Sequence, residues 1–552
     1  MSVGRREFII ATLGSAAAAQ LLGCGDDAVE KDSIDLKLFA HGVASGDPLA
    51  DAVIVWTRVT EPGAPSVAVE WLLSKDPELD SVLKSGLVTT TADTDFTVKV
   101  DVTGLEAGTT YYYAFRVGKR RSLAGRTRTM PAVAERARIA FTSCANYQNG
   151  YFNVYGAIAK RLDLDLWVHL GDYIYEYKAG EYADPNLAAA RSHLPANEAI
   201  SLQDYRTRYA QYRGDPDLQL LHRQHPLVVV WDDHEFANNA YVDGAQNHDP
   251  SEGDWNDRKR AASRAFLEWL PIRVATADPV PKIFRTFKFG SLFDLIMLDT
   301  RMIARAKQAG DDDTSVGDPA VWRDPTRQLL GSEQEAWFLN ELAISRERGA
   351  RWRLVGNQVI ISQARDPRSP TVMGDPNMTR SILYSDFWDG YQPARDRVFN
   401  YLLEGGVQNV VFLTGDIHTS WAFEVSKDPF DPAVYNPAEG RKAFAIELVG
   451  PSVTSLALEG TDLETAAPAL LPTANPHLKH IEVTRKGYVL VDLSQERMQA
   501  EWWYVKQYKV PNDAAEELAK AFTCQQSTAT LVATTTASPP KDAPTPAPTP
   551  LA

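Results

Sequence analysis

LWVHLGDYIY runs from Leu166 to Tyr175, and this stretch decides how the chain is organised. Its first five residues are mostly apolar and lead into Gly171, which is typical of a buried strand followed by a turn. Asp172 and Tyr175 stand after that turn, three positions apart. In layered α/β folds, sites collect outside the carboxyl ends of strands, because the strand is rigid and the following loop carries the functional groups. The stretch therefore predicts both an α/β sheet and a site at its edge.

The same arrangement, an apolar strand followed by polar residues, recurs along the chain after Pro131. The expected strands and the residues after them are 138–141 with Ser143-Cys144, 227–231 with Asp232-Asp233-His234-Glu235, 295–298 with Asp299, 353–355 with Gly356-Asn357-Gln358, and 410–413 with Gly415-Asp416-Ile417-His418. Helical patterns over 255–270 and 333–345 lie between them. The second begins with Ser332 and Glu335 at capping-box spacing and ends at Gly349. Alternating strands and helices predict a layered α/β domain.

The region before Pro131 has a different, all-β pattern that starts at about residue 36. Residues 52–58 are typical of a strand, residues 95–100 alternate with a period of two, and an aromatic strand over 110–115 follows a turn. This last stretch is similar to the corner before a late strand in fibronectin-type sandwiches. Because no cluster of catalytic residue types stands out here, we expect this region to serve as a scaffold or a lid.

Several polar residues that follow the expected strands can converge on one sheet edge. They are Cys144, Asp172, Tyr175, Asp233, His234, Asp416 and His418. Each alone has an ordinary structural explanation, since Gly-Asp is often a turn and a lone cysteine is often a small buried apolar residue. Together they favour a metal site. A thiolate and a phenolate suit ferric iron, whereas aspartate oxygens suit calcium, magnesium or manganese, and one aspartate can bridge two ions.

Composition limits the classes of partner. A chain of 552 residues predicts about two domains plus tails, and 44% hydrophobic with 23% charged residues is ordinary for a soluble globular protein. The formal net charge of −15 argues against nucleic acid as the main partner, and we expect no binding to duplex nucleic acid. An acidic protein that handles anionic substrates needs local cations to offset its own field.

The N-terminus, residues 1–24, resembles an export signal. Arg5-Arg6 precedes a short apolar run, and Leu21-Leu22-Gly23-Cys24 follows it, as in a twin-arginine signal that ends in a lipoprotein box. The apolar run is too short for a permanent transmembrane helix. A plain secretory signal is the alternative. We expect the twin-arginine machinery to export the protein to the cell envelope or periplasm with a membrane-attached lipid on Cys24, or to release it as a secreted protein.

The C-terminus and the cysteines allow only limited predictions. Residues 525–552 are rich in Pro, Thr and Ala, which predicts a disordered tail. The chain has three cysteines in all, and an odd number excludes a full disulfide framework. A bridge between Cys144 and Cys524 stays open, and a structural thiol is the default for Cys524.

The order of the polar blocks resembles that of the calcineurin-like metallophosphoesterases, and the Gly-Asp-x-x-Tyr spacing is similar to that of purple acid phosphatases. A closer resemblance is to the PhoD-like alkaline phosphatase family, over roughly residues 36–510. It is carried by the twin-arginine signal and by His41–Pro48, Ser143-Cys144, Gly171–Tyr177, Trp231–Asn239, Gly356–Gln358 and Gly415–Trp421.

The resemblance implies a fold and a set of ligands. The fold is an α/β four-layer metallophosphoesterase-type sandwich, two mixed sheets flanked by helices, over residues 137–510, behind an N-terminal all-β fibronectin-like sandwich domain over 36–131. The cofactors are one Fe³⁺ and Ca²⁺ ions, although ligand chemistry alone also permits Mn²⁺ or Mg²⁺ at the calcium positions. The residues carried over are Cys144, Asp172 and Tyr175 for iron, with His418 as a further candidate, and Asp172, Asp233 and Asp416 for calcium, joined by Asn239 or its neighbour Asn238.

The activity that follows is hydrolysis of phosphate monoesters by attack of a metal-activated hydroxide or oxide. Arg258 is the candidate guanidinium for the charge that builds on the phosphoryl oxygens, and a solvated helix face is its alternative. His234 is expected to bond the phosphate or protonate the leaving group, unless it only orients a ligand. A phosphodiesterase or phospholipase D-like activity with the same metal site is the first alternative function. A non-catalytic metal-binding envelope lipoprotein is the second.

Overall fold

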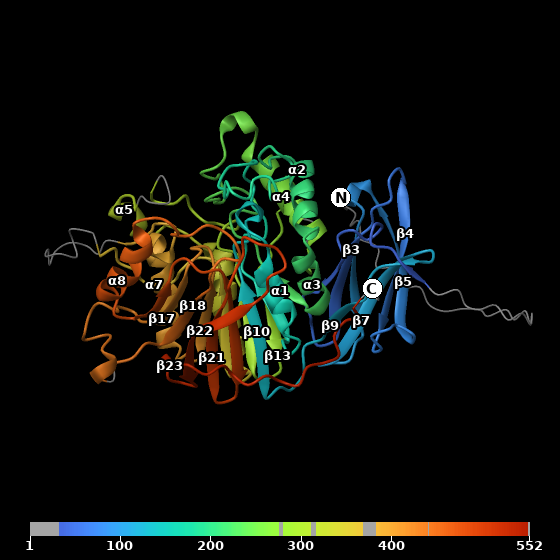
Figure 1. Cartoon of the computed structure of the whole chain (residues 1–552). Helices are drawn as coiled ribbons and strands as arrows, with labels where there is room; N and C mark the ends of the chain where they lie inside the picture. Colours follow the sequence, from blue (N-terminus) through green and yellow to red (C-terminus); the bar gives the residue numbers. More distant parts are fainter. Residues whose placement is uncertain (1–31, 275–279, 311–315, 368–381, 440, 550–552) are drawn as a thin grey trace, which may run out of the picture.

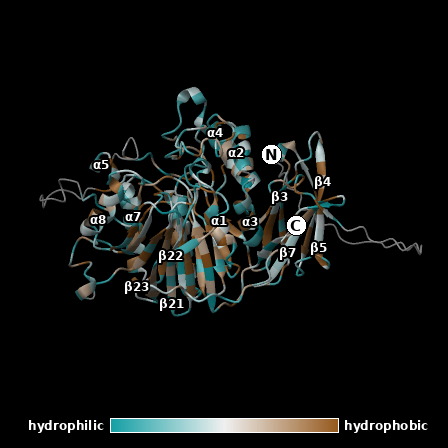
Figure 2. Ribbon diagram, in the orientation of Figure 1, coloured by the Kyte–Doolittle hydropathy of each residue, from teal (hydrophilic) through white to brown (hydrophobic). Residues whose placement is uncertain are grey.

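The computed structural model describes residues 32–274, 280–310, 316–367, 382–439 and 441–549 (Figure 1). The predicted export signal and Cys24 lie outside these residues. No helix among the described residues has the length and apolar character needed to cross a bilayer. Figure 2 shows apolar residues concentrated along the strands in the middle of the molecule.

Two large mixed sheets form the body of the protein. The ten-stranded sheet has the order β23 (Val532–Thr534), β22 (Glu516–Gln525), β21 (Arg497–Val505), β20 (Gly487–Ser494), β10 (Arg136–Thr142), β11 (Leu166–His169), β12 (Leu227–Val229), β2 (Val43–Gly46), β3 (Ala52–Arg58) and β6 (Thr97–Thr103). The seven-stranded sheet has the order β13 (Arg285–Phe289), β14 (Phe293–Met297), β15 (Trp352–Asn357), β16 (Val410–Thr414), β18 (Ala445–Val449), β17 (Ser420–Val425) and β19 (Leu478–Glu482).

The eight helices of the described residues are α1 (Asn153–Ala159), α2 (Leu202–Arg213), α3 (Pro216–Gln224), α4 (Trp255–Trp269), α5 (Pro319–Trp322), α6 (Gly331–Glu347), α7 (Gln392–Glu404) and α8 (Leu463–Ala474). Alternate residues of the seven-stranded sheet face opposite sides, as the pleat requires. Leu295 and Leu354 pack with the ten-stranded sheet in one core, whereas Ile296 and Val355 pack with α6 and α7 in a second core. Helices α1 to α4 share the first core. The expected four-layer sandwich is therefore confirmed.

The N-terminal all-β region is also present, but it shares a sheet with the body. Its six-stranded sheet contains β1 (Ser33–Ile34), β8 (Arg120–Arg121), β7 (Thr110–Val117), β4 (Ser66–Ser74), β5 (Val82–Thr91) and β9 (Gly125–Arg128). It packs against β3 and β6, which belong to the ten-stranded sheet. The joint is β2, which pairs Gly46 with Leu227 of β12. The predicted corner forms a hydrogen bond in which the Glu106 N–H donates to the Tyr111 hydroxyl over 2.9 Å.

The C-terminal segment differs from the prediction of a disordered tail over 525–552. Residues 532–534 form β23 on the sheet, and the chain then runs along the body to the N-terminal sandwich (Figure 1). There the carbonyl oxygen of Thr545 accepts a hydrogen bond from the Tyr112 hydroxyl at 2.6 Å, and Pro544 accepts one from Arg126 at 3.2 Å. The segment lacks a core of its own, as its composition indicates, but the body supplies donors for its carbonyl groups. The sheet also extends past residue 510 through β22.

The structure also answers three smaller questions about local structure. The capping-box prediction for α6 is wrong, because the helix begins at Gly331 and its N-cap, Leu330, makes no side-chain cap. Gly349 does follow the helix end with φ 76°, which is the left-handed conformation expected after a helix. Cys144 and Cys524 are both buried free thiols, so they form no bridge.

Candidate metal centre

The carboxyl ends of two sets of parallel strands deliver the polar residues to one place. Strands β10, β11 and β12 run parallel in one sheet, and β14, β15 and β16 run parallel in the other. The loops after these strands carry the predicted ligands. Asp172, Asp233 and Asp416 line a single cavity of about 1180 Å³, part of which is open to solvent.

Three overlapping groups of donor atoms lie in this region. Within each group, one donor atom per residue lies within 4.8 Å of the others; the groups are Cys144 with Asp172 and His418, Asp172 with Asp233 and His234, and Asp232 with Asp233 and Asp416. Asp172 belongs to the first two groups and Asp233 to the last two. Shared carboxylates of this kind suit neighbouring cations, because each carboxylate offers two oxygens.

Tyr175 joins the first group, of which His418 is already a member. The Tyr175 hydroxyl lies 3.0 Å from Oδ2 of Asp172 and 3.0 Å from Nε2 of His418. On the other side of its ring, His418 places Nδ1 2.6 Å from the carbonyl oxygen of Leu456, to which it donates. That bond fixes the proton on Nδ1, so the lone pair of Nε2 faces the group.

The backbone is strained at several of these residues. Left-handed φ values occur at Cys144 (62°), Asp172 (54°), Asn239 (54°), Asp416 (65°) and His418 (63°). Such conformations cost about 1–3 kcal/mol for residues other than glycine and concentrate at functional sites. The strain supports a functional role for the loops that carry the predicted ligands.

Glu235 and Gly171 hold two of these loops together. The Glu235 carboxylate accepts hydrogen bonds from the backbone N–H groups of Asp172 (3.0 Å), Tyr173 (2.6 Å) and Asp232 (2.7 Å). Gly171 has φ 105°, and a Cβ there would lie 2.4 Å from the backbone nitrogen of Asp232. Only glycine allows this close approach of the two loops.

Gln358 and Asn357 belong to the scaffold and not to the ligand groups. The Gln358 amide donates to the carbonyl oxygens of Trp231 (2.9 Å) and Leu298 (2.8 Å), so it ties the ends of strands in different sheets. The Asn357 amide oxygen accepts from Nε1 of Trp388 at 3.0 Å. This block of the sequence therefore positions the loops.

Burial keeps protons on the candidate ligands in the absence of a cation. It raises the pKa of the Cys144 thiol well above its ordinary value, and the neighbouring Asp172 carboxylate raises it further. The pKa of the Tyr175 phenol rises for the same two reasons. Burial also raises the pKa of Asp232 to about 6, although Arg301 opposes this shift. A bound cation would reverse these preferences, since it stabilises the deprotonated ligand.

His234 lies against the first group. Its Nδ1 is 2.7 Å from Oε2 of Glu176, and its ring stacks on Tyr175 with centroids 4.1 Å apart. Burial lowers the pKa of His234, but the carboxylates of Glu176 and Asp233 outweigh burial and raise it well above the ordinary value. Because Nδ1 is engaged, Nε2 is the atom left for a ligand or substrate.

Two residues at the centre were not among the predicted site residues. The Arg301 guanidinium is fully buried and lies 2.5 Å from Oδ1 of Asp232, 3.0 Å from Oδ1 of Asp386 and 2.7 Å from Oδ1 of Asp416. Arg301 stands shortly after β14 in Asp299-Thr300-Arg301, so the strand-end pattern could have found it. Asp386 follows no strand, and no sequence signal marks it.

Arg258 lies elsewhere. Its side chain is buried, its Nη2 is 2.6 Å from Glu198 and its Nη1 is 3.0 Å from Glu252. Its Nε donates to the Tyr205 hydroxyl at 3.1 Å. Arg258 does not line the cavity of the three groups. The guanidinium that contacts the groups is Arg301. The alternative of a solvated helix face for Arg258 is wrong, because its side chain is buried.

Asn239 and its neighbour both line the cavity. The Asn239 backbone N–H donates to Oδ2 of Asp233 at 2.5 Å, and its side-chain amide donates to Gln246 at 2.7 Å. Asn238 also donates its amide to Gln246. The structure thus places Asn239 beside Asp233, next to the third group.

The residues present fit the metals that the resemblance implies. A thiol, a phenol, an imidazole whose Nε2 faces the group and a carboxylate converge at the first group, and this donor set suits iron. The third group contains carboxylates alone, which suits a hard cation such as calcium. Once deprotonated, the buried first group would need a cation to compensate its charge.

Comparisons with known proteins agree with this architecture. The sequence model of the family described as PhoD-like phosphatase matches residues 139–502, and that of its N-terminal domain matches residues 26–131. The chain is 36% identical to Alkaline phosphatase D of Bacillus subtilis (strain 168) over 477 residues, which cover 84% of this chain and 77% of the relative. It is also similar to a solved structure described as "Structure of PhoD", with a TM-score of 0.80 and 33% identity over 91% of this chain and 92% of that one.

Proposed function

Since this chain belongs to the PhoD-like phosphatase family and is a phosphoric ester hydrolase of the alkaline phosphatase D type, we propose that it hydrolyses phosphate monoesters with metal ions held at the three donor groups. The observation that carries the proposal is the overlap of the groups through Asp172 and Asp233. Overlapping groups suit cations close enough to act on one phosphoryl group.

The donor chemistry supports one assignment of the metals. Iron would be held by Cys144, Asp172, Tyr175 and His418, and calcium by Asp172, Asp233 and Asp416, with Asn239 adjacent. Mn²⁺ or Mg²⁺ at the calcium positions is the alternative that the same oxygens permit. When bound, such ions neutralise charge on phosphoryl oxygens and lower the pKa of a bound water.

The protein's own residues supply the remaining interactions. Arg301 is fully buried and does not line the cavity, so its always-charged guanidinium acts through the carboxylates that it positions, Asp416 among them. Four carboxylates hold it in place, so it needs no reorganisation. His234 donates Nδ1–H to Glu176, which orients Nε2 toward the phosphate or the leaving oxygen.

A direct test uses the protein that starts after Cys24, prepared with iron and calcium. An aryl phosphate monoester is expected to be hydrolysed, and calcium chelation is expected to abolish turnover. Metal content is measured on the same sample. Metal-loaded protein that cleaves a bis-aryl diester and leaves the monoester intact would replace the monoesterase proposal with the phosphodiesterase. Metal-loaded protein that cleaves neither would support the binding role.

We further propose that residues 1–24 direct export through the twin-arginine machinery and that Cys24 receives lipid. The support is the sequence pattern alone. In a Gram-negative or Gram-positive host, replacing Arg5-Arg6 by Lys-Lys is expected to retain the full-length protein inside the cell. Cys24→Ser is expected to remove labelling by a fatty acid. Export unaffected by the paired lysines would contradict the twin-arginine route.

A further inference from the structure

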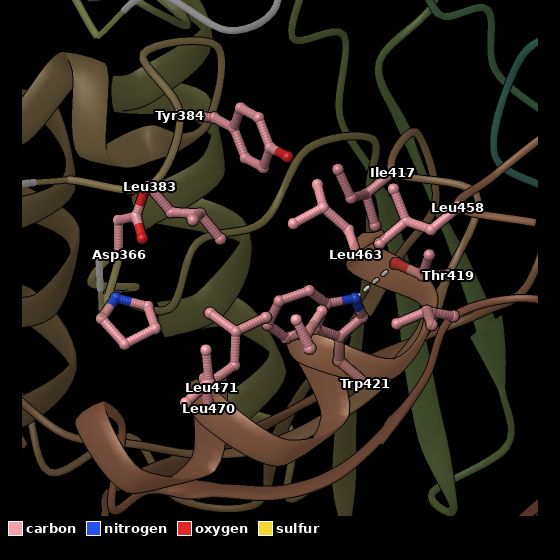
Figure 3. Close-up of a pocket in the computed structure, with 14 residues that line it drawn as sticks. Asp366, Leu383, Tyr384, Ile417, Thr419, Trp421, Leu458, Leu463, Leu470 and Leu471 are labelled. Carbon is pink, nitrogen blue, oxygen red and sulfur yellow. Dashed lines mark hydrogen bonds between the residues drawn. The ribbon is translucent and has the colours of Figure 1, made fainter. Parts of the chain in front are cut away.

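A second, apolar cavity lies beside the one that contains the donor groups (Figure 3). It holds about 570 Å³ of space, part of which is open to solvent. Helix α8 forms one wall, and the loop after β16 with the start of β17 forms another. Figure 3 shows the Trp421 indole facing this space together with Leu463 and Ile417. None of the predicted metal ligands lines this cavity, which we call the apolar cavity.

The apolar cavity adjoins the candidate metal centre. Tyr384, Ile417, Leu458 and Leu463 line both cavities. Ile417 stands between Asp416 and His418, two of the predicted ligands. A molecule whose phosphate lies at the donor groups therefore has a hydrocarbon wall beside it, one residue away along the chain.

The walls offer contact with hydrocarbon and few polar groups. Trp421 is 3% exposed, and its indole N–H already donates to the Thr419 hydroxyl at 2.5 Å. Leu471 is 6% exposed and packs in the same apolar cluster. Leu470 is 42% exposed although it lines the cavity, so a large apolar side chain faces water at this place. Covering such a surface with an apolar ligand group is favourable.

We infer that the apolar cavity binds the hydrocarbon part of the ester's alcohol group, so that the preferred substrates are phosphate esters of apolar alcohols. This inference rests on the proposed function, because it takes the phosphate to lie at the donor groups. The occupant follows from the two cavities being neighbours that share Ile417 and Leu458. A sugar or another polyhydroxyl alcohol would place hydroxyl groups against the leucine and Trp421 side chains, which offer them no partner.

The experiment compares n-alkyl phosphates of increasing length, from methyl through butyl and hexyl to octyl phosphate, below their micelle concentrations. The leaving oxygen is nearly the same in the longer members, so differences report on binding of the chain. Burial of each methylene is expected to raise kcat/KM by about fourfold until the cavity is filled. A series that stays flat from butyl to octyl phosphate would overturn the inference while leaving the phosphatase proposal intact.

Two variants on α8 sharpen the test. Ala466→Phe fills the apolar cavity, because Ala466 lines it, and is expected to reduce the ratio of octyl to methyl phosphate turnover at least tenfold. Ala469→Phe is the matched control, since Ala469 lies on the same helix, is exposed and does not line the cavity; its ratio is expected to equal that of the parent. Equal ratios in both variants would contradict the inference.

Binding separates this inference from the proposed function. If the metal-loaded protein hydrolyses no ester, the phosphatase proposal fails, and calorimetry with methylphosphonate and octylphosphonate then tests the cavity alone. The inference would be supported if octylphosphonate binds at least a hundredfold tighter than methylphosphonate to the parent and to Ala469→Phe, but not to Ala466→Phe. Equal affinities for the two phosphonates would overturn it.

Discussion

Nη2 of Arg301 lies 2.7 Å from Oδ1 of Asp416, although the two residues follow different strands and are far apart in the sequence. Asp416 is one of the predicted ligands, and the same guanidinium contacts Asp232 and Asp386. One buried cation thus organises carboxylates from several loops. This relationship makes Arg301 a structural centre of the site, which holds carboxylates of the cavity in place.

Replacing Arg301 is the first prediction. Arg301→Gln is expected to lower kcat by about 10–100-fold, as for loss of an outer partner that positions metal ligands. It also leaves buried carboxylates without their partner, which typically costs about 3–5 kcal/mol. Because calcium can replace the lost charge, added calcium is expected to raise the Tm of the variant more than that of the parent. Steady-state kinetics and thermal unfolding with and without calcium measure both effects.

Arg258→Gln is the matched control for that experiment. It breaks a buried ion pair with Glu198 outside the cavity, so it is expected to reduce stability without changing kcat of the folded enzyme. A fall in kcat equal to that of the Arg301 variant would show that Arg258 takes part in the chemistry after all.

Asp172 is expected to be the most sensitive carboxylate, since it belongs to two donor groups. Loss of an outer partner of a metal ligand costs up to about 100-fold in activity. Asp172 is proposed as a ligand itself, so Asp172→Asn should reduce kcat/KM by more than that and should reduce the content of both metals. Elemental analysis and turnover of an aryl phosphate test this. Asp217→Asn, a half-buried carboxylate on α3, serves as the control. Full activity of the Asp172 variant with normal metal content would refute the assignment.

Gly171→Ala probes the contact between the loops. The new Cβ would lie 2.4 Å from the backbone nitrogen of Asp232, and the alanine would have to keep the φ of 105°. We therefore expect the free energy of unfolding to fall by at least about 2–3 kcal/mol and the activity to be lost. Gly180→Ala separates the two effects, because φ is 82° there but no atom lies within 4 Å of its Cβ; about 1 kcal/mol is expected. Urea unfolding at fixed metal concentration measures both. Equal costs would mean that backbone conformation alone matters at Gly171.

Seven fully or partly buried histidines are expected to reduce the free energy of unfolding of the metal-free protein below pH 6.5, in opposition to buried carboxyl groups whose pKa is raised. Burial lowers the pKa of His41, His169 and His477 to about 3, and of His480 to about 4. Burial also lowers the pKa of His193, His222 and His225 well below the ordinary value. Their folded-state pKa values lie below the unfolded value, so the stability they contribute is present above about pH 6.5 and is lost as pH falls from there toward the folded pKa values.

Each such histidine makes the free energy of unfolding fall by up to about 1.4 kcal/mol more per pH unit. Urea unfolding of the metal-free protein at pH 7.5, 6.0 and 5.5 measures the slope without a contribution from metal release. His222→Gln should make the slope shallower by about one proton. A slope that is the same in the parent and in the His222→Gln variant would contradict a buried neutral His222.

The C-terminal segment is expected to stabilise the fold. Removing residues 535–552 eliminates hydrogen bonds to Tyr112, Arg126 and Gln224, each worth about 1 kcal/mol, and should lower the Tm without changing kcat. Removing residues 550–552 alone is the control. An unchanged Tm after the longer truncation would favour the disordered tail that composition indicates.

Much of the site could be predicted because its residues follow a local rule. Cys144, Asp172, Asp233 and Asp416 each stand just after an apolar strand, and parallel strands bring their carboxyl ends together. The rule works where chemistry sits on strand-end loops, and Arg301 also obeys it through Asp299-Thr300-Arg301. Asp386 and the Leu456 carbonyl that fixes the His418 tautomer obey no such rule, since they come from loops whose course depends on packing.

By itself, the sequence determined the layered α/β fold, the all-β region before it and the donor types that converge after the strands, because apolar periodicity and strand-end polarity are local properties. The tertiary structure alone decided which arginine faces the donor groups, that the N-terminal sandwich shares a sheet with the body and that the Pro-rich segment lies along both. From the sequence alone, Arg258 and Arg301 are equally plausible candidates for the guanidinium at the site. The contacts of each guanidinium distinguish them. Arg301 contacts carboxylates of the donor groups, whereas Arg258 contacts Glu198 and Glu252.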